Sequence, residues 1–164
     1  MKILQSIFGR PKPDLRDTDQ LIFDLAEHGN RPADVSELYR RLPTMDLFAK
    51  VVSANFPLKN GARHTIGPGQ NLQIQNASLP SGHCLAQFFI DRADSRLGSQ
   101  FMSISPKAAC EMVFKIESIS GLLICNSKNS WIALLKPELQ RLLKKELAEP
   151  GAAPNGGPAT QLGN

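Results

Sequence analysis

The pattern of apolar and polar positions predicts two helices in the early part of the chain. Thr18 is a suitable N-cap, apolar residues then repeat on one helical face, and Gly29 follows the expected helix end near His28. A second, shorter helix is expected over 35–42, because Pro43 cannot continue it.

Two further helices are expected in the second half. Ser105 and Pro106 have the order of an N-cap and a first helical residue. Apolar residues then recur at helical spacing: Ala109, Met112, Val113 and Ile116. Pro137 begins a last helix whose expected inward face is leucine-rich: Leu139, Leu142, Leu143 and Leu147.

Between the helices, short segments have the alternating or continuously apolar pattern of strands. These segments are 47–52, 71–75, 84–90, 122–125 (opened by Gly121) and 131–135. The nearly unbroken apolar run 84–90 is typical of a central strand. Asn60-Gly61 is a strong turn signal, so 56–66 is expected to be a hairpin or a mobile loop. The pattern therefore predicts an α/β (α+β) fold with a single mixed β-sheet flanked by helices.

Composition limits this fold to one part of the chain. Residues 17–149 are expected to form a single α/β domain. A lead segment, 1–16, carries apolar residues at helical spacing and is expected to pack on its own domain or on a partner. The tail 150–164 is rich in glycine and proline, lacks charged side chains, and is expected to be disordered.

The cysteines and the charges favour a cytoplasmic protein without a nucleic-acid partner. Cys84, Cys110 and Cys125 are widely spaced in apolar stretches, which is typical of buried free thiols in a reducing compartment. No apolar run has the length of a signal-peptide core or a membrane span. The net charge of +4 is spread along the chain and forms no basic stripe with interleaved aromatic residues.

Candidate chemistry is sparse. His83 and Cys84 are adjacent, but neighbouring residues of a strand point to opposite faces, so a thiol–imidazole pair needs a turn between them. A small-ligand binder or hydrolase that uses this pair stays an alternative. The histidines are far apart and no cysteine or histidine repeats at ligand spacing, so we expect no metal and no cofactor.

The order of elements resembles the N-terminal domain of the bacterial SseB (enhanced serine sensitivity) family over roughly residues 19–145. The resemblance depends on Leu38-Tyr39, on 101–106 before a helix, and on 121–126 followed by Trp131. The family pattern has Asn-Pro-Gly at the end of that strand, whereas Ser127 and Lys128 follow Asn126 here. The resemblance implies a bacterial cytoplasmic setting, no established enzymatic activity and a role in protein interaction or regulation.

The polar turn before Trp131 is the candidate binding site. Turns between rigid strands often carry function, and tryptophan is enriched at interface hot spots, so we select Asn126, Lys128, Asn129 and Trp131. The alternative for Trp131 is a buried core position, which burial tendencies favour. We therefore expect a non-catalytic module that binds a protein partner of unknown identity. An immunity-type or secretion-system accessory protein is a narrower alternative.

Overall fold

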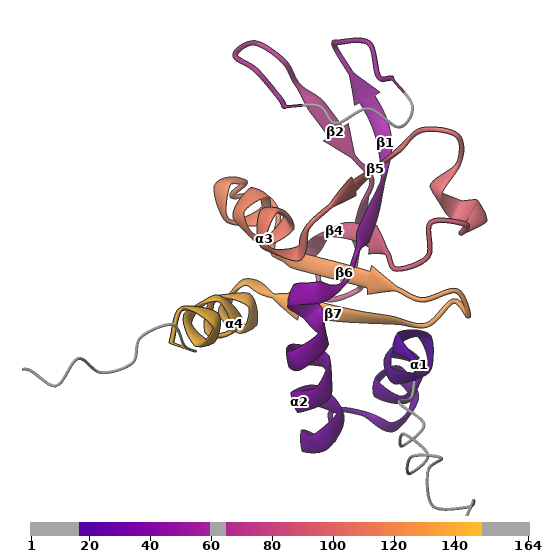
Figure 1. Cartoon of the computed structure of the whole chain (residues 1–164), viewed down its shortest axis with the longest axis vertical. Helices are drawn as coiled ribbons and strands as arrows, with labels where there is room; N and C mark the ends of the chain where they lie inside the picture. The colour runs from indigo at the N-terminus through magenta and orange to yellow at the C-terminus, as the bar shows by residue number, and fades with distance from the viewer. Residues whose placement is uncertain (1–16, 60–64, 149–164) are drawn as a thin grey trace, which may run out of the picture.

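One mixed sheet of seven strands, flanked by four α-helices, makes up the described part of the chain, residues 17–59 and 65–148 of a computed structural model (Figure 1). The strands are β1 Leu47–Ala54, β2 Leu72–Ile74, β3 Asn76–Ser78, β4 Cys84–Phe89, β5 Phe101–Ile104, β6 Gly121–Cys125 and β7 Trp131–Leu135. The helices are α1 Thr18–His28, α2 Pro32–Arg41, α3 Pro106–Lys115 and α4 Lys136–Ala148, with short 3-10 turns η1 Leu42–Thr44 and η2 Ser95–Leu97. The predicted α+β class is confirmed.

The sheet is parallel only at its centre. β4 pairs in parallel with β6, and every other strand pair is antiparallel. β1 pairs with both β2 and β5, and β6 continues through a tight turn into β7. Gln75, between β2 and β3, donates its N–H to Lys50 O (2.9 Å) and accepts from Gln87 N–H (3.0 Å). The β2–β3 segment is therefore bonded to β1 at one end and to β4 at the other.

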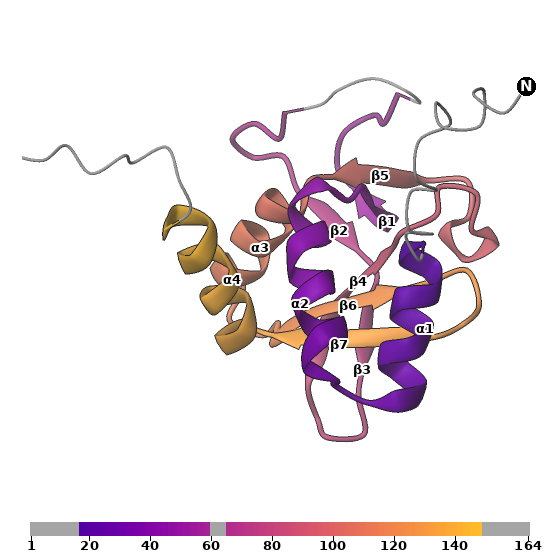
Figure 2. The ribbon, with the colours of Figure 1, turned by 60° about the horizontal axis from the view of Figure 1, so that its bottom comes forward.

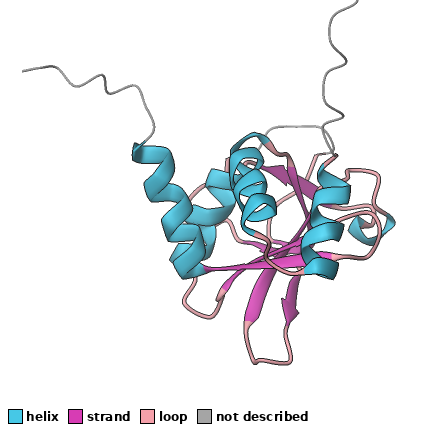
Figure 3. Ribbon diagram, turned by 90° about the horizontal axis from the view of Figure 1, so that it is seen from below, coloured by secondary structure: helices cyan, strands magenta, loops and turns pink. Residues whose placement is uncertain are grey.

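The two faces of the sheet are covered differently. All four α-helices contribute to the main apolar cluster on one face, and Figures 2 and 3 show the helices gathered on that side. The second face carries a smaller apolar cluster: Leu85, Phe89, Leu97, Leu123 and Cys125. Leu97 of η2 packs on the strands there, and no α-helix contributes to this cluster. Side chains on this second face therefore have less helical cover than those on the first.

The helix starts show how local signals act. Ser105 caps α3 as predicted, its hydroxyl accepting from Ala108 N–H at 3.3 Å. The N-cap of α1 is Asp17 and not Thr18, because the Asp17 carboxylate accepts the Gln20 N–H at 2.7 Å. α2 begins at Pro32, earlier than expected, since proline fits the first helical position. The 3-10 turn η1 then accommodates Pro43.

Some predictions concern residues outside the described ranges. They are the lead segment 1–16, the Asn60-Gly61 turn, the tail 150–164 and the side chain of Leu147. Within the described residues, none of the helices combines the length and the apolar character needed to cross a membrane.

Candidate functional site

The turn between β6 and β7 is organised by Asn126, whose side chain is fully buried. Its Oδ1 accepts the backbone N–H groups of Lys128 (3.0 Å) and Ser130 (2.8 Å). Its own N–H donates to Ser130 O at 3.0 Å. Asn129 supplies the left-handed residue of the turn, with φ of 62°, a conformation that asparagine adopts more readily than most residues.

The same turn is bound to the start of α1. Asn126 Nδ2 donates to Asp19 O at 3.0 Å, and Ser127 donates its N–H to Asp19 Oδ1 at 3.1 Å and its hydroxyl to Oδ2. Lys128 Nζ bonds Gln20 Oε1 at 3.1 Å and lies 5.8 Å from the centre of the Phe23 ring. These contacts hold the turn and α1 side by side (Figure 2).

This arrangement bears on the predicted binding role of Asn126. With no exposed surface and its side-chain oxygen and nitrogen both bonded within the chain, Asn126 has no group to offer a partner. Lys128 is exposed, but its ammonium group already bonds to α1. Asn126 and Lys128 therefore stabilise the turn, and the binding role of Asn129 and Trp131 stays a prediction.

A charged pair supports the turn from the other side. Arg96 Nε donates to Asp94 Oδ1 at 2.8 Å, and the Arg96 guanidinium also donates to Asn126 O. The guanidinium carbon lies 4.8 Å from the centre of the Phe89 ring. The hydrogen bond from Arg96 outweighs the effect of burial and holds the pKa of the Asp94 carboxyl below its usual range.

We expect Asp94→Asn to lower the free energy of unfolding by about 1–2 kcal/mol at pH 6, because the ion pair and its hydrogen bonds are weakened. The lowered pKa means that the stabilisation is complete above the unfolded pKa, near about 4, and is lost as the pH falls through the folded pKa. Urea unfolding at pH 6 and pH 3 should show the difference between the two proteins shrinking on acidification. Asp46→Asn, at an exposed aspartate, is the control, and a difference unchanged at pH 3 would contradict the prediction.

The register of β7 determines which backbone groups are free. The Asn126 N–H donates to Ser130 O at one end of the hairpin, and the Lys136 N–H donates to Ser120 O at the other. Because hydrogen-bonded pairs occur at every second residue of an antiparallel ladder, the backbone groups of Ile132 and Leu134 bond to β6. The N–H and C=O groups of Trp131, Ala133 and Leu135 therefore point away from the sheet. Leu135 N–H is taken by Glu138 Oε2 at 2.8 Å, which agrees with this register. Among residues 17–59 and 65–148, nothing bonds to the N–H or C=O groups of Trp131 and Ala133, so each offers an open donor and acceptor there.

Trp131 lies at this edge and is 47% exposed, so the alternative that it is a core residue is wrong. It pairs with Cys125 across the hairpin and shares a sheet face with Ala133 and Leu135, the face that the α-helices do not cover. A strand-end position on that face leaves much of the indole in solvent.

A shallow hollow of about 460 Å³ lies along the β7 edge, beside the second half of α1. One wall is residues 129–133; the other comes from α1 and the residues that follow it: Leu25, Ala26, Glu27 and Asn30. The hollow therefore combines open backbone groups, an exposed aromatic residue and a helix surface. The sequence pattern indicated Asn129 and Trp131 as candidate site residues. Ala133 and Glu27 could be added only from the structure, because their place at the hollow depends on the register of β7 and on the position of α1.

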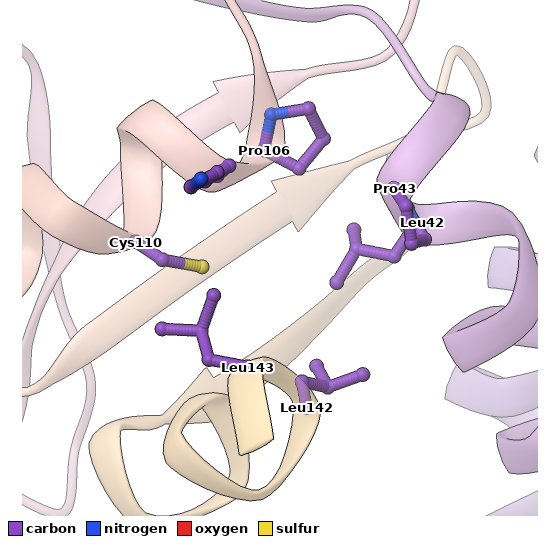
Figure 4. A pocket seen from close by; sticks show the side chains of 7 residues that line it. Leu42, Pro43, Pro106, Cys110, Leu142 and Leu143 are labelled. Atoms are coloured by element: carbon purple, nitrogen blue, oxygen red, sulfur yellow. The ribbon is translucent and has the colours of Figure 1, made fainter. Parts of the chain in front are cut away.

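A second pocket, among η1, α3 and α4, is too small for a ligand (Figure 4). Its volume of about 20 Å³ is close to that of one water molecule, and its labelled lining is mainly apolar: Leu42, Pro43, Pro106, Cys110, Leu142 and Leu143. It is a packing gap between helices.

The proposed thiol–imidazole pair is not assembled in the described residues, where no hydrogen bond joins His83 to Cys84. His83 is exposed, whereas Cys84 is half-buried and packs against the main cluster. None of the three cysteines forms a disulfide, as expected; Cys110 and Cys125 are buried, and burial raises the pKa of the Cys125 thiol.

The fold and this edge define an α+β protein with an open hydrophobic strand beside a surface hollow. Compared with protein-family models, curated proteins and solved structures, the chain has no match in any of the three. Membership of the SseB family therefore stays a prediction.

Proposed function

We propose that this chain is a non-catalytic protein-binding or regulatory module of the bacterial cytoplasm that binds its partner along β7. The observation that carries the proposal is the open hydrogen-bonding edge at Trp131 and Ala133, with an exposed tryptophan side chain beside it. An added strand completes such an edge through main-chain hydrogen bonds, and pockets for its alternate side chains supply specificity.

The composition of β7 supports this proposal. Proteins usually protect exposed edges with charged side chains, proline or a bulge, because an open edge promotes aggregation. β7, of sequence Trp-Ile-Ala-Leu-Leu, has no charged residue and no proline, and its pairing with β6 is regular. An unprotected apolar edge of this kind fits a surface that is covered by a partner.

Two further observations agree with the proposal. The absence of disulfides among the three cysteines fits a reducing compartment. The resemblance to the SseB N-terminal domain implies protein interaction without established catalysis. An immunity-type neutraliser or a secretion-system accessory protein would use the same edge with a more specific partner.

Site-specific cross-linking in the source organism tests the proposal. We expect a photo-reactive phenylalanine analogue at Trp131 to give a discrete cross-linked adduct with another protein. The same analogue at Val52, an apolar side chain of β1 that is 56% exposed, should not give that adduct. Ala133→Pro, combined with the probe at Trp131, should reduce the adduct at least about tenfold, because it removes an outward N–H and blocks strand addition.

The fold of the Ala133→Pro variant must be intact for this comparison. Its melting temperature should stay close to that of the wild type, since the Ala133 N–H makes no bond to β6. Equal adducts from Trp131 and Val52, or an adduct that survives Ala133→Pro, would reject the β7 edge as the binding site.

A further inference from the structure

We propose that the β7 edge binds an extended, basic peptide segment, with apolar side chains over the face of Trp131 and a lysine or arginine directed at Glu27. This inference rests on the proposed function and names the chemistry of the partner. Three features of the edge carry it: the alternation of its side chains, the charge of α1 and the use of the last β7 donor by Glu138.

The alternation of β7 defines two different environments for an added strand. Trp131, Ala133 and Leu135 lie on the sheet face without α-helices, whereas Ile132 and Leu134 belong to the cluster under the helices. Successive side chains of an added strand alternate in the same way, about 4.8 Å from β7. One set therefore contacts Trp131 and Ala133, and the other enters the hollow beside α1.

The wall of the hollow beside α1 carries one carboxylate, Glu27, and no lysine or arginine. α1 carries Asp19, Asp24 and Glu27 and no lysine or arginine. Asp19 is bonded to the β6–β7 turn, and Asp24 accepts from Gln20 Nε2 at 2.8 Å. Glu27 is exposed, lines the hollow, and makes no ion pair within the described residues. Because the lining of the hollow contains no lysine or arginine, a cationic side chain there is favoured.

The same features disfavour a second copy of the chain as the occupant. A two-fold axis through Ala133 would place the Trp131 carbonyl of one copy against the Leu135 N–H of the other, which Glu138 already bonds, whereas an axis through Ile132 would pair only the open groups of Trp131 and Ala133. Either axis would bring two acidic α1 helices to one junction. A separate basic segment pairs with the open groups of Trp131 and Ala133 without either penalty.

Amide chemical shifts of the full-length, ¹⁵N-labelled chain provide the test. The probe is a synthetic peptide that alternates valine with threonine and carries lysine at its central polar position; a matched peptide carries glutamate there. We expect the lysine peptide, at up to about 2 mM, to shift the amides of Trp131 and Ala133, and the glutamate peptide to bind at least about tenfold more weakly.

Charge reversal at the helix completes the experiment. Glu27→Lys should reverse the preference and favour the glutamate peptide, because the charge facing the added strand changes sign. Glu111→Lys, at an exposed position of α3, changes the net charge equally and should leave the preference for the lysine peptide in place. This pair of variants separates a local effect of Glu27 from general attraction.

Each outcome decides a different question. Equal binding of both peptides at the edge, or an unchanged preference in Glu27→Lys, overturns the basic partner but leaves β7 as a binding edge. Absence of shifts at Trp131 and Ala133 with either peptide overturns the inference, and the cross-linking result then decides the proposed function. Shifts that depend on protein concentration without peptide would identify a second copy as the occupant and would also overturn it.

Discussion

Gly121→Ala is expected to destabilise the protein by about 3 kcal/mol or more, or to prevent folding, because the added methyl group collides with backbone atoms. A Cβ at this position would lie 2.2 Å from Leu134 O and 2.8 Å from Leu135 Cα. Gly121 pairs with Leu85 of β4 on one side and with Leu135 of β7 on the other. The strand cannot move away from one neighbour without disturbing the other.

Guanidinium-induced unfolding followed by circular dichroism gives the measurement. Gly67→Ala is a matched control, because a Cβ there meets only the Gln70 side chain, at 3.6 Å, and should change stability by less than about 0.5 kcal/mol. A Gly121→Ala protein within about 1 kcal/mol of the wild type would show that the two strands can separate at this point.

Elements with strong local signals could be predicted from the sequence. α3 has an N-cap, a proline at its first position and a helical apolar repeat, and it begins at Pro106 as expected. β6 and β7 are short apolar runs on either side of a polar turn, and both have the predicted positions. In these segments the local pattern and the tertiary environment favour the same structure.

β5 and β3 could not be predicted in the same way. β5 has only 4 residues, and none of them is fully buried. It is a strand because it pairs with β1. β3 has 3 residues, two of them exposed and polar, and is separated from β2 by Gln75. Strands this short depend on long-range partners, which a sequence pattern does not contain.

The exposure of the candidate site residues could not be predicted from the sequence for a similar reason. A tryptophan in an apolar strand is usually buried, but Trp131 lies at the end of an edge strand, on the sheet face without α-helices, and is exposed. Asn126 looks like a surface residue of a polar turn, yet it bonds to α1, 107 residues away in sequence. Exposure at both positions depends on packing between distant segments.

Asn126→Ala is expected to lower the free energy of unfolding by about 2–4 kcal/mol, because one side chain satisfies both the turn and the start of α1. Its Oδ1 accepts two backbone N–H groups and its Nδ2 donates to Asp19 O, so alanine leaves all three without this partner. Asn126→Asp retains an acceptor for Lys128 and Ser130. It should still be strongly destabilised, because it places a carboxylate oxygen against the Asp19 carbonyl, which Asn126 Nδ2 bonds in the wild type.

Urea unfolding of both variants should be compared with that of Asn129→Gly, a change in the same turn. Asn129 is exposed and has a positive φ that glycine adopts readily, so this control should stay within about 0.5 kcal/mol of the wild type. Because Asn126 links the hairpin to α1, its loss should also increase hydrogen exchange at both segments, at Ile132, whose N–H bonds to β6, as well as at Gln20. A stable Asn126→Ala protein, with unchanged exchange at α1, would mean that the helix and the hairpin hold their positions independently of this side chain.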